Sequence, residues 1–561
     1  MKPPAILKPY VLPFLPGLTA LAFSWLSLMP SLLPRAFYFQ GLLTALVALL
    51  GYGFGALAGW LLDGMKLPIS QSARQWIRRV LLVGGGLITL IMLWLSHRWQ
   101  SAQRDFVGME AAPFWHVLAG ALIGVLLFAV LLVLSRCLRG LGRFLGRHIG
   151  RVLPRRLAAA ISVIVVAAIT LNVVDNLFLT RFARLMDATY LTINDEFSTD
   201  VPAPMQPELS GSADSLQGWG SLGRYGRVFV SDAADPADIA AFTGTEAMQP
   251  IRVYVGKNDA EGAGATDELD MSAQADLAIA ELERTGAFDR EVINVVTSTG
   301  RGWINENQAQ ALEYMWNGNT ATVSMQYSYL PSWMSFLVDT DRAEAAGRYL
   351  FEAVYARWSE LPEDSRPRLV VSGESLGSYG AEGAFVSMQD LTVRTSGALF
   401  VGPTAMNHLW NDIVTHRDAG TPMYLPTVDG GTDVRFSADG ESWTGSGDWD
   451  GPRVGYVQHA NDPVKAFSIG LALNRPDWLD SGQRGPGVPS QMHWVPIVTM
   501  LQVGVDLFAG DVPEGQGHSF GDAPARAWTH ILPPPGWTPE DTDRLVEELA
   551  RVAGEDLDSL A

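Results

Sequence analysis

The hydrophobic pattern divides the chain into two unlike parts near residue 187. In the first part, apolar residues form five long runs, at 14–33, 40–62, 79–96, 114–135 and 157–179. Each run approaches the ~20 residues that a helix needs to cross a bilayer. The pattern therefore predicts a membrane domain of about five helices at 1–187. The first run contains Pro16 and Pro30, which leaves a broken or interfacial helix as the alternative there.

Beyond residue 187 the pattern changes. Residues 188–224 are rich in Pro, Ser, Gly and acidic residues, which is typical of a linker. Short β-branched runs then alternate with longer amphipathic ones. The runs expected to be strands are "RVFVS" 227–231, "IRVYV" 251–255, "VINVV" 292–296, "ATVSMQYSY" 321–329, "RLVVS" 368–372, "ALFVG" 398–402 and "VGYVQ" 454–458, and helical patterns fill 271–286, 306–317 and 341–358. The alternation predicts a mainly parallel sheet flanked by helices at 225–561.

One long interval lies between the strands expected near 402 and 454. In its residues 421–452, Asp-Gly turns surround "VRFS", which predicts a small hairpin. We expect this interval to form a lid over the candidate nucleophile, Ser375, which is described below. Its Asp448 and Asp450 are oxygen donors of the kind that bind calcium, but without a twelve-residue EF-hand loop a solvated acidic loop is the preferred interpretation.

The first part of the chain is basic, whereas the second part is acidic. Up to Asp187 there are 18 Lys and Arg against 5 Asp and Glu, and beyond it there are 22 against 54. Basic residues gather between runs two and three, and seven arginines lie between Arg136 and Arg156. Such loops face the cytoplasm, so the acidic C-terminal part is expected on the opposite side of the membrane. The single Cys137 excludes an internal disulfide.

The chemistry suggested by the second part centres on "RLVVSGESLGSYG". Here a predicted strand enters a Gly-x-Ser-x-Gly turn at Gly373–Gly377, and small residues follow. A nucleophile elbow needs small residues on both sides of its serine, because the backbone is strained and the next helix packs closely. Ser375 is therefore the candidate nucleophile. A phosphate-binding turn is the alternative, but no Walker lysine and no G-x-G-x-x-G sequence follows a strand.

A serine hydroxyl needs a histidine base, which a carboxylate must orient. In an α/β-hydrolase the order along the chain is serine, acid, histidine. Asp462 follows a predicted strand and is the candidate acid, although a turn-forming Asp before proline is an equally good interpretation. His518 in the glycine-flanked "GQGHSFG" is the candidate base, and His493 is the second choice.

An oxyanion hole needs two backbone N–H donors. One is expected from Leu376, directly after the nucleophile, and the other from the loop "TSTGRGWI" after an earlier strand, at Gly300 or Arg301. A plain glycine-rich turn is an equally ordinary explanation of that loop.

Together these stretches resemble the bacterial membrane-anchored alpha/beta-hydrolase family, which has a multi-span N-terminal domain and a C-terminal hydrolase domain. The resemblance rests on "TSTGRGWI", "GESLGSYG", "VGPT", "YVQHANDPV", "PDWL", "MHWVPIVTMLQVGVDL" and "GQGHSFG". It implies a serine-type hydrolase, with Ser375, Asp462 and His518 at the positions of its triad, and it specifies no substrate.

The sequence thus predicts a serine hydrolase of the bacterial inner membrane that cleaves an ester or related acyl bond. Its expected partners are the lipid bilayer and an ester or lipid-like substrate, with no nucleic acid, cofactor or metal; the oligomeric state stays open. Two alternatives remain. An acyltransferase would use the same triad. A non-enzymatic scaffold or transporter component would use the domain only for binding, yet no acidic or basic residue lies deep inside the predicted spans except Asp175, near the outer end of the fifth run.

Overall fold

The computed structural model of the chain describes residues 14–64, 71–151, 202–257, 267–331, 334–336, 340–508 and 512–559, with a few more between 154 and 168. Contacts divide the chain into two compact units. The first comprises Met1–Arg181, Phe467–Leu479 and Gly487–Pro513; the second comprises Phe182–Ala466, Asp480–Pro486 and Glu514–Ala561.

The first unit is built from long apolar helices. Its four N-terminal helices are α1 (Leu15–Ser27), α2 (Phe37–Gly64), α3 (Gln71–Phe106) and α4 (Trp115–Ile149). In the described part of the chain, three helices are long and apolar enough to cross a membrane: Phe37–Leu62, Gln75–Phe106 and Trp115–Ile149. They contain the second, third and fourth predicted runs.

The other two predicted runs have different outcomes. Helix α1 has 13 residues, and at 1.5 Å per residue it is too short for the ~30 Å hydrocarbon core. This favours the alternative of a broken or interfacial helix for the first run. Most of the fifth run, 157–179, lies outside the described residues.

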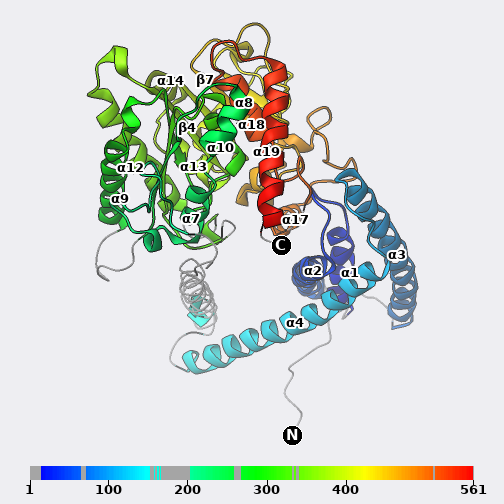
Figure 1. The fold of residues 1–561 in the computed structure, drawn as a ribbon. Helices are drawn as coiled ribbons and strands as arrows, with labels where there is room; N and C mark the ends of the chain where they lie inside the picture. The colour runs from blue at the N-terminus through cyan, green and yellow to red at the C-terminus, as the bar shows by residue number, and fades with distance from the viewer. Residues whose placement is uncertain are drawn as a thin grey trace. The chain divides into compact units, whose positions relative to one another are not determined.

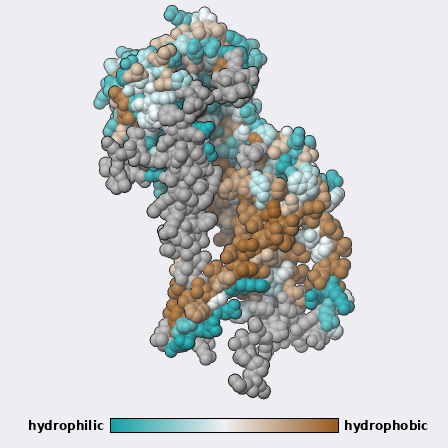
Figure 2. Space-filling view, turned by 60° about the horizontal axis from the view of Figure 1, so that its bottom comes forward, coloured by the Kyte–Doolittle hydropathy of each residue, from teal (hydrophilic) through white to brown (hydrophobic). Residues whose placement is uncertain are grey.

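The surface of this unit is unusually apolar. Large hydrophobic side chains of α2, α3 and α4 are exposed, among them Trp60, Leu82, Leu90 and Val125. Figure 2 shows the hydrophobic surface gathered over these helices. Because a soluble monomer rarely leaves such a large apolar patch in water, the surface fits contact with lipid.

The first unit also contains a segment from far along the chain. Helix α17 (Val498–Asp506), with the short helices η6 (Ile469–Ala472) and η7 (Asp477–Leu479), folds with the N-terminal helices. Val498 and Val505 of α17 form an apolar cluster with Leu43 and Val47 of α2.

Polar contacts reinforce this packing. The Nε of Arg35 lies 2.7 Å from Oδ1 of Asp506, and neither side chain is exposed to solvent. The Leu32 N–H donates to the other carboxylate oxygen at 3.0 Å. Since a buried charge is tolerated only when it is paired, these bonds fix α17 against the chain between α1 and α2.

The second unit is an α/β domain. Its seven strands are β1 (Ile251–Val255), β2 (Val292–Thr297), β3 (Thr320–Met325), β4 (Arg368–Glu374), β5 (Gly397–Val401), β6 (Val434–Ser437) and β7 (Arg453–Val457). They form one sheet in the order β1-β3-β2-β4-β5-β7-β6, and all the neighbours are parallel. Nearly every strand residue is buried, because helices cover both faces of the sheet. This confirms the predicted fold class.

Helices pack on the two faces of this sheet, as Figure 1 shows for α9 and α12 at one flank and α10, α18 and α19 at the other. The described α-helices of this unit are α7 (Gly223–Ser231), α8 (Pro236–Thr243), α9 (Asp267–Arg284), α10 (Glu306–Met315), α12 (Thr340–Ser359), α13 (Leu376–Glu382), α14 (Met388–Arg394), α15 (His408–Thr415), α16 (Pro463–Ala466), α18 (Ala523–Ile531) and α19 (Pro539–Ser559). Short 3-10 turns are η2 (Trp219–Leu222), η3 (Ala287–Asp289), η4 (Glu363–Ser365) and η5 (Asp429–Gly431).

Two local predictions are wrong. "RVFVS" 227–231 is not a strand but the end of α7, in which Gly223, Gly226, Arg227 and Val230 are buried at helical spacing. A five-residue apolar run does not distinguish the two periods.

"VRFS" is not part of a hairpin either. It is the edge strand β6, parallel to β7, and Phe436 stacks on Tyr456 with ring centroids 5.1 Å apart. The chain must loop back through 438–452 to make this parallel pairing, which the Asp-Gly turns allow.

Part of the segment predicted as a linker is also packed. Leu209 is buried, and the Ser210 N–H donates to the carbonyl of Arg252 in β1 at 3.0 Å.

Candidate active site

Ser375 stands at the turn between β4 and α13. Its backbone lies in the left-handed region, with φ 58° and ψ −123°, and few L-residues adopt such a conformation without cost. A Cβ added to Gly373 would lie 2.3 Å from the carbonyl oxygen of Gly377, and one added to Gly377 would lie 2.2 Å from that of Thr297. Both glycines are therefore required, and the turn has the features of a nucleophile elbow.

Asp462 and His518 come together although 55 residues separate them in sequence. The Nδ1 of His518 lies 2.7 Å from Oδ2 of Asp462, whose side chain is completely buried. The second carboxylate oxygen accepts a hydrogen bond from the Val464 N–H at 2.8 Å. Because a carboxylate accepts, the proton of the neutral ring is held on Nδ1 and its Nε2 is left basic.

The loop that carries His518 is fixed by the turn that carries Asp462. Nδ1 of His459 lies 2.9 Å from the Gly517 carbonyl, and the Gly517 N–H donates to Oδ1 of Asn461 at 3.1 Å. His459 lies three residues before Asp462 in the sequence. His459 and Asn461 thus each make one contact with Gly517, the residue before His518, and no sequence spacing indicated this positioning role.

Ser375 and His518 line the same cavity, whose volume is about 410 Å³. Nε2 of His518 is buried and has no hydrogen-bond partner among the described residues. Burial lowers the pKa of this imidazole, but the charge and hydrogen bond of Asp462 and the charge of Glu374 outweigh that effect and raise it. The cavity thus holds a hydroxyl and a basic nitrogen next to space for a ligand.

The two expected oxyanion donors belong to different segments, the start of α13 and the loop after β2. Leu376 is the first residue of α13, where an N–H has no carbonyl partner within the helix. Gly300 is buried in the loop after β2, which also carries the cavity residue Thr299. The N–H of Thr299 itself is engaged by the Trp303 carbonyl at 2.9 Å. The assignment of Leu376 and Gly300 stays a prediction.

Glu374 was not identified from the sequence. It precedes the nucleophile, lines the cavity, and accepts a hydrogen bond from Nδ2 of Asn305 at 2.6 Å. Asn305 caps α10 through its Oδ1, which accepts from the Gln308 N–H at 3.3 Å. Burial raises the pKa of Glu374, opposed by the Asn305 bond and the His518 charge, and the net shift is upward. The sequence signal that could have identified Glu374 is its position between Gly373 and Ser375 in the elbow.

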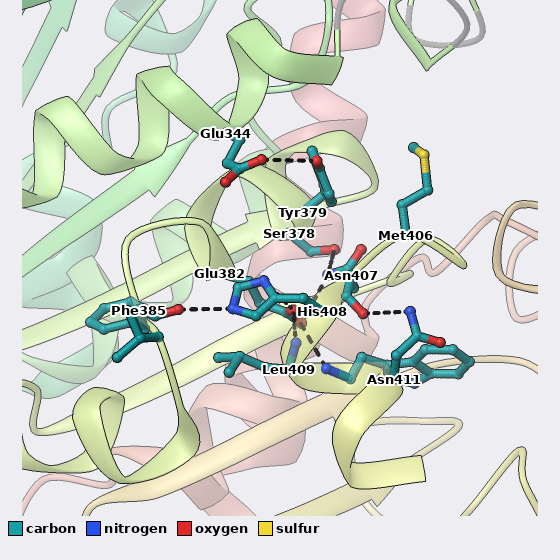
Figure 3. Close-up of polar contacts among 12 residues, drawn as sticks. Glu344, Ser378, Tyr379, Glu382, Phe385, Met406, Asn407, His408, Leu409 and Asn411 are labelled. Atoms are coloured by element: carbon teal, nitrogen blue, oxygen red, sulfur yellow. Dashed lines mark hydrogen bonds and ion pairs between the residues drawn. The ribbon is translucent and has the colours of Figure 1, made fainter. Parts of the chain in front are cut away.

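The buried carboxylate of Glu382 is linked to the turn at Ser375 by a chain of hydrogen bonds. Glu382 ends α13 and accepts hydrogen bonds from Nδ2 of Asn407 at 2.9 Å and the Tyr456 hydroxyl at 2.8 Å. Asn407 also donates to Oγ of Ser378 (Figure 3), and that hydroxyl donates to the carbonyl of Ser375 at 2.8 Å. Because buried polar networks hold one arrangement when each member is paired, this chain fixes the strained turn.

The remaining sequence candidates lie elsewhere. His493 is exposed and belongs to the first unit. From the interval 421–452, Tyr424, Leu425 and Ala438 line a second cavity, of about 640 Å³, and no residue of that interval lines the first cavity. Asp448 and Asp450 are both exposed, and the described residues contain no group of three His, Cys, Asp or Glu suited to a metal ion.

Comparison with known families covers most of the chain. The model of the Alpha/beta-hydrolase family matches residues 251–545, which include all seven strands and the three residues of the candidate triad. The model of the Alpha/beta-hydrolase family N-terminus matches residues 28–233. No curated protein and no solved structure matches the chain significantly.

Proposed function

Since the chain belongs to the alpha/beta-hydrolase family, we propose that it is a membrane-embedded serine hydrolase that cleaves an ester or related acyl bond through an acyl-enzyme. The observation that carries the proposal is the 2.7 Å contact between His518 and Asp462 at a cavity shared with Ser375. A family fold alone does not establish activity, because related folds also serve binding.

In the proposed mechanism the Ser375 hydroxyl attacks the carbonyl carbon of the ester, and its proton passes to Nε2 of His518. Asp462 stabilises the imidazolium, and the N–H groups of Leu376 and Gly300 bind the oxyanion. Collapse of the tetrahedral intermediate breaks the bond to the alcohol oxygen, which takes the proton from His518. Water then attacks the acyl-enzyme by the same steps, and the acid and free serine result.

The composition of the cavity favours hydrolysis over acyl transfer. Its lining includes the polar side chains of Asn305, Asn307 and Ser519 besides three carboxylates. An acyltransferase must keep water from the acyl-enzyme, which a dry apolar site would do better.

We further propose that the protein resides in the inner membrane of a bacterium with the hydrolase domain on the outer side. The three apolar helices and the arginines at the end of α4 support this topology. A tethered site remains close to the bilayer, which makes a lipid or lipid-linked ester the favoured substrate.

A fluorophosphonate probe tests the activated serine directly. We expect it to label the detergent-solubilised full chain, and Ser375→Ala to abolish labelling. His518→Ala and Asp462→Asn should slow it strongly, the latter by up to ~10⁴-fold, as for the same change in other triads. A folded wild-type chain that resists labelling would favour the binding-scaffold alternative.

A further inference from the structure

Among the described residues, the cavity beside Ser375 is lined by acidic side chains and by no lysine or arginine. Glu306, Glu374 and Glu514 all line it, and of the described lining residues only His518 is able to carry a positive charge. The indole of Trp303 forms another part of the wall, and aromatic faces also attract cations. A bound ligand therefore meets an excess of negative charge close to the reacting serine.

Glu374 is held in place rather than free to swing into solvent. It is partly buried, and Asn305 donates to it at 2.6 Å. Since the other atom of that amide is fixed by its bond to the Gln308 N–H, Nδ2 must face the carboxylate. Adjacent to the nucleophile in the chain, this carboxylate lines the same cavity as Ser375 and His518.

The neighbouring cavity also has more negatively than positively charged side chains in its lining. It shares Glu514, Phe520 and Gly521 with the first and is also lined by Asp439, Glu441 and Asp522. Its one arginine, Arg526, is paired with three carboxylates, at 2.8 Å from Asp522, 3.4 Å from Asp543 and 3.7 Å from Glu441. That guanidinium therefore offers little attraction to an anion.

We propose that the site selects esters by charge, favouring a positively charged alcohol part over a neutral one and excluding a negatively charged one, with Glu374 and Glu514 as specificity-determining residues. The inference rests on the proposed hydrolase function. Coulomb interactions over about 6 Å in a partly solvated site change binding by roughly tenfold per pair of charges. Selection acts on the alcohol part because the acyl carbonyl itself must lie at Ser375.

The selectivity should depend on pH. Burial raises the pKa of Glu374, against the hydrogen bond from Asn305 and the charge of His518 and together with the charge of Asp462. Glu306 and Glu514 face the same cavity. As the pH rises and Glu374 ionises, the preference for cationic esters should grow. The ratio of two substrates at one pH cancels the titration of His518, which both need.

The test compares three butyrate esters of similar size, those of choline, 3,3-dimethylbutanol and 3-hydroxypropanoate, on the full chain in uncharged detergent micelles. We expect kcat/KM to fall in that order, with a cation-to-anion ratio of at least tenfold at pH 8. Glu374→Gln and Glu514→Gln should each lower this ratio, Glu374→Gln by about tenfold. The control Glu363→Gln, an exposed residue outside both cavities, should leave it unchanged.

Equal or better turnover of the anionic ester, or an unchanged ratio in both variants, would overturn the inference. Labelling rates with fluorophosphonates that bear a trimethylammonium or a sulfonate group give the same ratio if none of these esters is turned over. Wild-type labelling without charge preference would reject the selectivity alone, whereas no labelling at all would reject the proposed hydrolase.

Discussion

At the scale of single residues, the site depends on two carboxylates that act on one imidazole. Burial lowers the pKa of His518, and Asp462 and Glu374 raise it above the usual value. Asp462 acts through a hydrogen bond as well as its charge, whereas Glu374 acts by charge alone. In the proposed mechanism the histidine must be neutral to accept the serine proton, so we expect the acid limb of the activity profile to lie above that of a free imidazole.

Replacing Glu374 by Gln removes a negative charge that favours the imidazolium. The pKa of His518 should then fall, and the acid limb of kcat/KM should move to lower pH. A neutral ester measured from pH 4.5 to 9 checks this, since such a substrate has no charge contact of its own. A limb that stays in place or moves upward would show that the carboxyl is not ionised, or not close enough to act, when the histidine titrates.

At the scale of elements, the chain between the candidate acid Asp462 and the candidate base His518 is divided between the two units. Asp462 and His518 belong to the second unit, whereas Phe467–Leu479 and Gly487–Pro513 fold with the N-terminal helices. Asp462 lies a few residues before that excursion and His518 a few residues after it. The Arg35–Asp506 pair links the second of these segments to the chain between α1 and α2.

Asp506→Ala should destabilise the protein by about 3–5 kcal/mol, because it leaves Arg35 buried without its partner. The double variant Arg35→Met/Asp506→Leu should recover most of the loss, since it removes both charges and preserves volume. Denaturant unfolding in mixed micelles measures both.

The matched control for that experiment is Glu291→Ala. Glu291 pairs with Arg368 at 2.8 Å, with both side chains about half exposed, so the cost should be at most ~1 kcal/mol. If Asp506→Ala cost no more than this control, the buried pair would not hold α17.

At the scale of the whole molecule, charge and hydrophobicity bear on the proposed membrane topology. Helix α4 has 35 residues, about 50 Å at 1.5 Å per residue, so it extends well beyond a ~30 Å hydrocarbon core. Its arginines, from Arg136 onward, lie in the part that extends past it. In the proposed topology, the positive-inside rule assigns that end to the cytoplasmic side.

The single cysteine makes this topology testable without altering the native chain. Cys137 is exposed on the basic part of α4. A maleimide that does not cross membranes should fail to label it in intact spheroplasts and should label it after detergent treatment. In a Cys137→Ser background, Ser442→Cys, at an exposed position of the hydrolase domain, should react without detergent. The reverse pattern would place the hydrolase domain in the cytoplasm.

The sequence by itself determined the features that depend on local pattern. Strands such as "VINVV" and "RLVVS" were recognisable because a parallel sheet buried on both faces needs continuous β-branched runs. Gly373 and Gly377 marked the elbow because no side chain fits there. The apolar runs of α2, α3 and α4 were equally clear, since a span needs both length and the absence of charge.

Only the tertiary structure decided what depends on contacts between distant segments. "VRFS" became an edge strand because β7 offers a free parallel neighbour, and "RVFVS" became helical because its buried positions face β1. Glu374 is held by a hydrogen bond from Asn305, 69 residues earlier. Asp506 is paired with Arg35, 471 residues earlier. Local patterns record which residues are buried, but the partner of a buried charge is set by how the chain folds back on itself.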